Sequence, residues 1–180
     1  MRSATTGADP RPLTGEPLAL DLLNTRWRQD GEVHDLLADE AGLGVWLRAA
    51  GLDRTPDAAT LRHTLSARDA LLAAVDGADD GVARVDAVLG HGRIRATLTA
   101  AGPGEVPEFE DPARAPGWLA ARNYLELLRT APDRIRPCAH EACLLHFLDT
   151  SRNGTRRWCS MALCGNRAKA SRHYARSRES

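Results

Sequence analysis

Apolar residues recur at helical spacing through most of the first 130 positions of the chain. Asp39 is a suitable N-cap and Gly51 a suitable stop for a helix between them. The apolar face of this helix consists of Leu43, Trp46 and Leu47. Three further helices are expected, with apolar stripes at Leu61, Leu65, Leu72 and Val75 after Thr55–Pro56, at Val82, Val85 and Leu89, and at Trp118, Ala121, Leu125 and Leu128 after Asp111–Pro112. The pattern predicts a mainly helical body.

Two other segments alternate in the way that strands do. Leucines and other residues alternate over 18–22, which predicts a short strand there, with a helical turn as the alternative. Ile94, Ala96 and Leu98 alternate with polar residues, which predicts a half-buried strand. Residues 101–104 then supply a turn, and 106–109 can return as the partner strand. The expected fold class is α+β, a mainly helical N-terminal domain with a short β-hairpin.

The four cysteines form two pairs near the end of the chain. Four residues separate Cys138 from Cys143 and Cys159 from Cys164, and 15 residues separate the pairs. Two such pairs supply four thiolates to one tetrahedral ion, and zinc suits soft thiolates. The spacing therefore predicts one Zn²⁺ per chain on these four residues, with an iron–sulfur cluster, disulfides or free thiols as alternatives.

The residues around the cysteines predict a small module of their own. Residues 145–149 and 155–158 flank turn residues that include Asn153–Gly154, which predicts a β-hairpin. A helix is expected over 167–178, so that knuckle, hairpin and helix follow the order of a treble-clef zinc finger. Residues 132–137 contain two prolines and are expected to join residues 1–132 to residues 133–180 with few contacts, which leaves the body able to fold without the finger.

These residues resemble two known families. The C-terminal part resembles the bacterial CGNR zinc finger, and the start of the body is similar to the domain called ABATE. The matching positions are Cys164–Arg167, Phe147, Asp149, Ser151, Asn153 and Arg157–Cys159 for the finger, and 20–26 with Trp46–Leu47 for the body. The resemblance implies a bacterial stress-response regulator of transcription, with a treble-clef finger proposed to bind DNA and an N-terminal domain proposed to bind an unidentified ligand.

Charge is divided unevenly along the chain. Residues 1–133 contain 14 Arg and 21 acidic residues, whereas residues 134–180 contain 9 Arg, 1 Lys and 3 acidic residues. Guanidinium groups bind phosphate oxygens and guanine edges, so the basic end predicts DNA binding, with RNA left open. The expected contacts are Arg152, Arg156, Arg157, Asn166, Arg167, Lys169, Arg172 and Arg176. For Asn166 a helix-capping role is favoured over a base contact.

A polar group in the body is a second candidate site. Asp21, Asn24, Thr25 and Arg26 directly follow an apolar segment, where they form either the edge of a ligand site or a capped turn. Motifs for phosphate-binding loops, dinucleotide binding, serine hydrolysis and zinc proteolysis are missing from the sequence, and a four-cysteine zinc has no open position for substrate. We therefore do not expect an enzyme.

The sequence also bears on location and assembly. The polar start of the chain and the lack of a long apolar run predict a cytoplasmic protein with no membrane segment. A homodimer is possible, because a single module offers only a short DNA footprint. Three functions remain in order of preference: a zinc-dependent DNA-binding regulator that senses a ligand, a protein-interaction adaptor with a purely structural zinc, and a thiol redox sensor.

Overall fold

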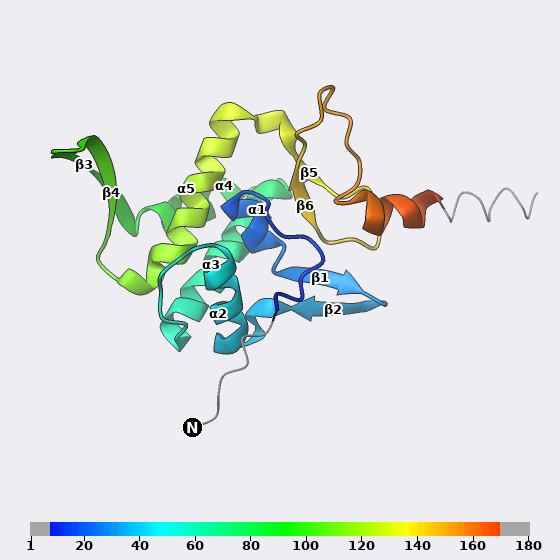
Figure 1. Ribbon diagram of the computed structural model, residues 1–180, viewed down its shortest axis with the longest axis horizontal. Coiled ribbons are helices and arrows are strands. Elements are labelled where there is room, and N and C mark those ends of the chain that lie inside the picture. Colours follow the sequence, from blue (N-terminus) through cyan, green and yellow to red (C-terminus); the bar gives the residue numbers. More distant parts are fainter. Residues whose placement is uncertain (1–7, 170–180) are drawn as a thin grey trace, which may run out of the picture.

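The computed structural model describes residues 8–169, and it is mainly helical (Figure 1). The short helix α1 (Leu18–Leu23) packs against α3 (Ala58–Val75) and α5 (Ala115–Thr130), and α2 (Glu40–Ala49) and α4 (Gly81–Leu89) pack against α3. Short 3-10 turns at Leu36–Ala38, Pro112–Arg114 and Pro132–Arg134 connect these elements. The α+β class is confirmed. Within the described residues, no helix is both long and apolar enough to cross a membrane.

Three antiparallel strand pairs complete the described part of the chain. They are β1 (Arg26–Gln29) with β2 (Glu32–Asp35), β3 (Gly92–Thr99) with β4 (Gly102–Phe109), and β5 (Ile135–Pro137) with β6 (His146–Leu148). The β3–β4 hairpin confirms the strand expected around Ile94, but it projects from the helices (Figure 1). Its Leu98 is therefore 83% exposed, and the expectation of a half-buried strand is wrong.

The hairpin β1–β2 is not among the expected elements, although its turn carries a recognisable signal. Asp30 and Gly31 form the turn, and both have positive φ, at 51° and 86°. This is the combination that a two-residue type I′ turn requires, for which Asp-Gly is a favoured pair. The flanking strands are short and polar, so they lack the alternation of apolar and polar residues that marks a half-buried strand.

The segment expected as a strand over 18–22 is the helix α1, so the helical alternative is the correct one. Four of its six residues are nearly or fully buried leucine or alanine, and Asp21 is buried as well. A helix surrounded on all sides carries apolar residues all round, and its sequence then has no helical period to detect. The apparent alternation is a consequence of complete burial.

Helix α3 begins and faces differently from the expectation. Its N-cap is Asp57, whose carboxylate accepts a hydrogen bond from the Thr60 amide at 2.8 Å, so the helix does not start at Thr55–Pro56. Its most buried face carries the small residues Thr64 and Ala67 rather than Leu61 and Leu65. The reason is close packing with α5, where a Cβ on Gly117 would lie 2.6 Å from the Cβ of Ala67.

The other helices agree in position and differ in detail. Asp39 caps α2 as predicted, by accepting a hydrogen bond from the Gly42 amide at 2.8 Å, and Gly51 ends it with a φ of 67°. Val82 on α4 is exposed although it was assigned to a stripe. On α5, Tyr124 and Leu127 are buried in place of Leu125 and Leu128, a rotation of the buried face by one residue.

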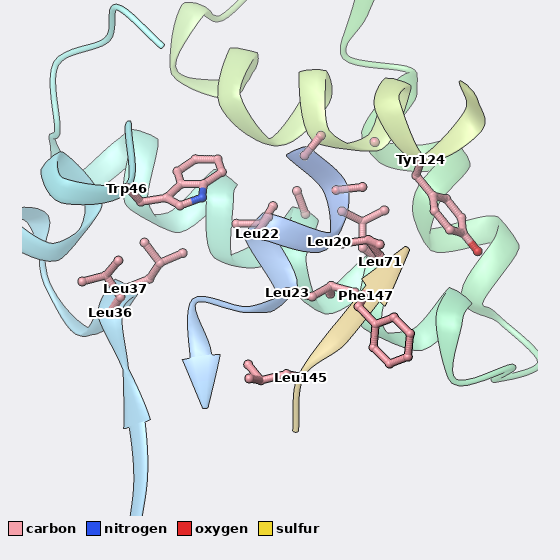
Figure 2. Packing of buried hydrophobic residues seen from close by; sticks show 14 of the residues in the cluster. Leu20, Leu22, Leu23, Leu36, Leu37, Trp46, Leu71, Tyr124, Leu145 and Phe147 are labelled. Atoms are coloured by element: carbon pink, nitrogen blue, oxygen red, sulfur yellow. The ribbon is translucent and has the colours of Figure 1, made fainter. Parts of the chain in front are cut away.

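The helical body and the C-terminal part share one hydrophobic core. Leu145 and Phe147 beside and within β6 pack with the α1 leucines Leu20 and Leu23 (Figure 2). Residues 132–137 are a 3-10 turn followed by β5, which pairs with β6. The expectation that this segment joins two parts with few contacts is therefore wrong.

Candidate metal centre

Four cysteine side chains converge where the C-terminal part folds over on itself. Cys138 directly follows β5, Cys143 precedes β6, and Cys164 lies in a π-helical turn at Met161–Gly165. Their Sγ atoms and that of Cys159 all lie within 4.8 Å of one another, and none of the four is in a disulfide. The two pairs predicted to come together form one cluster.

The spacing of the sulfur atoms fits a single metal ion. A tetrahedral zinc with Zn–S bonds of about 2.3 Å separates neighbouring sulfurs by about 3.8 Å. The structure has 3.6 Å between the Sγ atoms of Cys159 and Cys164, and 3.9 Å between those of Cys143 and Cys159. An iron–sulfur cluster distributes its cysteines over several irons, so four sulfurs this close favour one ion.

The protonation of the thiols explains why the cluster needs a cation. Hydrogen bonds from Cys143 and Cys159 lower the pKa of Cys138, and the bond to Cys138 raises the pKa of Cys143 to about 12. The bond to Cys138 also raises the pKa of Cys159. Four thiolates at this separation repel one another, so the fully deprotonated cluster requires the positive charge of a bound metal ion.

The loop between the cysteine pairs is held by internal hydrogen bonds rather than by a second strand. The carboxylate of Asp149 accepts from the amides of Ser151 and Arg156 at 2.9 and 3.0 Å. Residues 155–158 do not form the strand that was expected, and β6 pairs with β5 instead. Gly154 has a φ of 63°, and a Cβ there would lie 3.0 Å from the guanidinium of Arg134. The Asn-Gly turn is therefore correct, but its hairpin is not.

Arg156 has partners inside this loop. Its guanidinium lies 4.2 Å from the ring centroid of Phe147 and donates hydrogen bonds to the carbonyls of Trp158, Leu148 and Cys159. These contacts tie the strand β6 to the second cysteine pair. Because its donors are used internally, we do not include Arg156 in the surface offered to a nucleic acid.

The outer edge of β6 is paired by side chains of the helical body. Asn24 at the end of α1 donates from Nδ2 to the His146 carbonyl and accepts at Oδ1 from the His146 amide, both at 2.9 Å. Glu16 accepts from the Leu148 amide at 2.9 Å. A strand edge leaves alternate amides and carbonyls unpaired, and here these two side chains take the place of a third strand.

The other residues of the predicted ligand group are also internal. The carboxylate of Asp21 accepts from the guanidinium of Arg11 at 2.8 Å and from the indole of Trp46 at 3.0 Å. Thr25 is fully buried and accepts a hydrogen bond from Arg68 at 2.9 Å. Only Arg26, on β1, is exposed. Thr25 also donates to the Leu22 carbonyl at 2.7 Å, a local bond at the end of α1 that agrees with the capped-turn interpretation. Asp21, Asn24 and Thr25 thus belong to a buried polar network.

The remaining basic residues of the finger face solvent. Arg152, Arg157, Arg167 and Lys169 are exposed, and the guanidinium of Arg157 lies 5.2 Å from the ring centroid of Trp158. Asn166 is exposed inside a helical segment, and the cap of that segment is Ser160, so the expected capping role of Asn166 is wrong. Arg172 and Arg176 lie outside the described residues.

Comparisons with known proteins divide the chain at the same place as its charge. Residues 16–131 match the model of the family ABATE, which is described as "putative stress-induced transcription regulator". Residues 134–177 match the model of the CGNR zinc finger. No curated protein matches the chain. Both resemblances inferred from the sequence are confirmed, and the four-cysteine cluster lies within the zinc-finger match.

Proposed function

The chain belongs to the ABATE family and carries a CGNR zinc finger, and from this premise we propose that it is a zinc-dependent transcription regulator whose finger binds DNA. The single observation that carries the proposal is an exposed group of cations on a module held by a metal centre. This group, the finger cations, consists of Arg152, Arg157, Arg167 and Lys169.

The finger cations have little acidic charge beside them in the sequence. Residues 134–180 contain three acidic residues, and one of them, Asp149, is buried and bonded to its own loop. Such an excess of positive charge attracts the phosphate backbone and makes binding depend on counterion release. Arginine at three of the four positions adds the planar fork that can bind two phosphate oxygens or a guanine edge.

We test this with fluorescence anisotropy on a labelled duplex of random sequence, at several KCl concentrations. With about four to six phosphate contacts, the plot of log affinity against log salt should have a slope of about −4 to −5. Arg157→Gln and Arg167→Gln should each weaken binding to every sequence and reduce the steepness of the slope by about one. If the replaced arginine contacts a base edge, the variant should instead lose sequence preference at one base pair, with a loss of about 1–3 kcal/mol in discrimination against the wrong base.

The matched control is Arg129→Gln, because Arg129 is an exposed arginine on α5 in the body. This variant should leave DNA affinity unchanged, and all three variants should keep their zinc and their melting temperature. A single-stranded RNA of the same sequence separates the two nucleic acids. If the zinc-loaded protein binds neither the DNA duplex nor the RNA at low salt, the proposal is wrong and the adaptor interpretation replaces it.

We also propose that the N-terminal part senses a ligand, as the family description supports a regulatory role for it. The hydrogen-bonding atoms of Asp21 and Asn24 are used by Arg11, Trp46 and His146, which favours a ligand site at a different place on the body.

A further inference from the structure

A hollow opens where three helices of the body, α3, α4 and α5, meet. Its volume is about 660 Å³, and it is lined by residues of α3, of α4 and the end of α4, and of the start of α5. Sites for small molecules commonly have volumes of about 300–1,000 Å³. The hollow is therefore large enough for a ligand of modest size.

The rim of this hollow carries basic side chains. Arg62, His63, Arg84, His91 and Arg114 all line it, against one lining carboxylate, Asp69. Burial, and then the guanidinium of Arg114, lower the pKa of His63, so the fixed positive charges are those of the three arginines, of which Arg84 is paired with Asp80 at 2.7 Å. An anion placed among them would be attracted by several fixed charges together.

Two of these arginines retain donors for a ligand. The guanidinium of Arg62 donates to the Ala58 carbonyl at 3.1 Å, and no carboxylate within residues 8–169 forms an ion pair with it. Arg114 is 3.9 Å from Asp111, a carboxylate that also lies 3.4 Å from His63. The separation of 3.9 Å is too long for a hydrogen bond, so Asp111 leaves the five N–H donors of the Arg114 guanidinium unused.

The floor of the hollow is apolar and held in place. Leu65 and Val88 line it from α3 and α4, and Trp118 lines it from α5. The indole N–H of Trp118 donates to the Leu89 carbonyl at 2.8 Å, and its ring packs edge-to-face with Phe109. With its polar atom already bonded, Trp118 contributes ring surface to this floor.

From this juxtaposition of an apolar floor and a cationic rim, we propose that the hollow between α3, α4 and α5 binds a small organic carboxylate with an aromatic or branched apolar body. The carboxylate would be held by Arg62 and Arg114, whose planar forks match its two oxygens. The apolar body would lie on Leu65, Val88 and Trp118. The sensing role of this site rests on the proposed function, whereas the binding itself does not.

The position of the hollow connects it to the rest of the molecule through α3. Arg68, two turns along the same helix from Arg62, pairs with Asp35 at 2.7 Å and bonds Thr25, the residue that follows Asn24. Asn24 in turn holds the finger strand β6. A ligand that fixes α3 against α4 and α5 therefore acts on the helix that positions this connection.

The experiment uses the full-length zinc-loaded protein and isothermal titration calorimetry with 2-naphthoate as the probe. Its uncharged counterpart, 2-naphthamide, has the same rings and tests the charge requirement. The carboxylate should bind at least ten-fold more tightly than the amide. Inorganic phosphate alone should bind more weakly than 2-naphthoate, because it makes no use of the apolar floor.

Three variants and one control test the location. Arg62→Gln and Arg114→Gln should each weaken 2-naphthoate binding at least five-fold, and Ser66→Trp, which fills the hollow from the exposed side of α3, should abolish it. The control is Arg129→Gln, because Arg129 is exposed on α5 and does not line the hollow. This variant should bind 2-naphthoate as tightly as the unaltered protein does. Circular dichroism confirms that each variant is folded.

Equal affinity for the carboxylate and the amide overturns the proposal. Binding of 2-naphthoate only at many millimolar, or binding that Ser66→Trp leaves intact, overturns it as well. DNA affinity is measured on the same samples without the probe. A protein that binds 2-naphthoate but no DNA refutes the proposed regulator function and supports this site. A protein that binds DNA but not 2-naphthoate refutes this site and supports the regulator function.

Discussion

Replacing Asn24 with alanine removes the side chain through which the body holds the finger. The amide of Asn24 makes two hydrogen bonds of 2.9 Å to the backbone of His146, and the side chain is completely buried. Asn24→Ala therefore leaves one buried N–H and one buried carbonyl without their partners. We expect this change to destabilise the whole protein rather than the finger alone.

The expected magnitude follows from the two orphaned groups. A buried polar group that loses its partner costs about 1–3 kcal/mol, so two of them cost about 2–5 kcal/mol, allowing for some entry of water. Domains of this size have a total stability of about 5–15 kcal/mol, and the substitution thus removes a large part of it. The control is Asn153→Ala, because Asn153 is an exposed residue of the finger loop, where a change of at most about 0.5 kcal/mol is expected.

The assay is urea unfolding of the zinc-loaded protein. The same samples are monitored by far-ultraviolet circular dichroism, which reports the helices, and by zinc release to a chromogenic chelator. Both transitions should coincide in the unaltered protein and should move together in Asn24→Ala. A change below 0.5 kcal/mol, or a helical transition that stays in place while zinc is released earlier, would refute the shared-core reasoning. Sequence alone suggests the second result, since it separates body from finger at residues 132–137.

Two further predictions concern the metal and the ion pair on α3. Cys159→Ser should reduce the zinc content, measured by elemental analysis, from about one equivalent per chain to well below that. It should also lower the urea midpoint of the helical transition, because the cluster is part of the shared core. Full zinc content in the variant would exclude this cysteine as a ligand. Burial opposes ionisation of Asp35, but the hydrogen bonds from Arg68 dominate and lower its pKa from the ordinary 3.8. A lowered pKa adds stability above the unfolded value that is lost as pH falls below 3.8, so Asp35→Asn should destabilise by about 1–3 kcal/mol at pH 7 and progressively less below pH 3.8 in urea titrations; a difference independent of pH would contradict the ion pair.

The four-cysteine cluster was predictable from the sequence because its information is local. Each short pair of cysteines determines one turn, and two turns are enough to complete a tetrahedral shell. Helices α2 to α5 were predictable for a similar reason, since caps such as Asp39 and stops such as Gly51 act within a few residues, whereas α1 was expected as a strand.

The errors occur where distant segments determine the outcome. The alternation at 18–22 is uninformative because α1 is buried on every side by α3, α5 and β6. Helix α3 turns Thr64 and Ala67 inward because Gly117, some fifty positions away, admits α5 at close range. The partner of β6 is β5 rather than residues 155–158, because Asp149 and Arg156 satisfy the loop by themselves.

The polar group after α1 shows why the same residues suggested a ligand site. Asp21, Asn24 and Thr25 have side chains with free hydrogen-bonding capacity when the sequence is considered alone, which is the usual mark of a binding edge. Apart from the local bond between Thr25 and the Leu22 carbonyl, their partners are 10 to 122 positions distant: Arg11, Trp46, Arg68 and His146. The sequence of the segment does not show whether a polar side chain hydrogen-bonds a ligand or a distant part of the protein.

The contact at Asn24 gives the two family resemblances a common physical basis. Asn24 belongs to the stretch over 20–26 that resembles ABATE, and Phe147, next to His146, belongs to the positions that resemble the CGNR finger. Leu20 and Leu23 from the first stretch pack in the same core as Phe147 from the second (Figure 2), and Asn24 pairs with the backbone of His146. Each motif therefore buries groups that the other one satisfies. The finger without the body would expose the edge of β6 and Phe147, and the body without the finger would expose α1. A metal ion bound by the four cysteines would consequently stabilise the core of the body as well. Helix α3 meets the finger through more than one contact, because Arg68 bonds Thr25 beside Asn24, and Asp76 at the end of α3 lies 3.8 Å from His146.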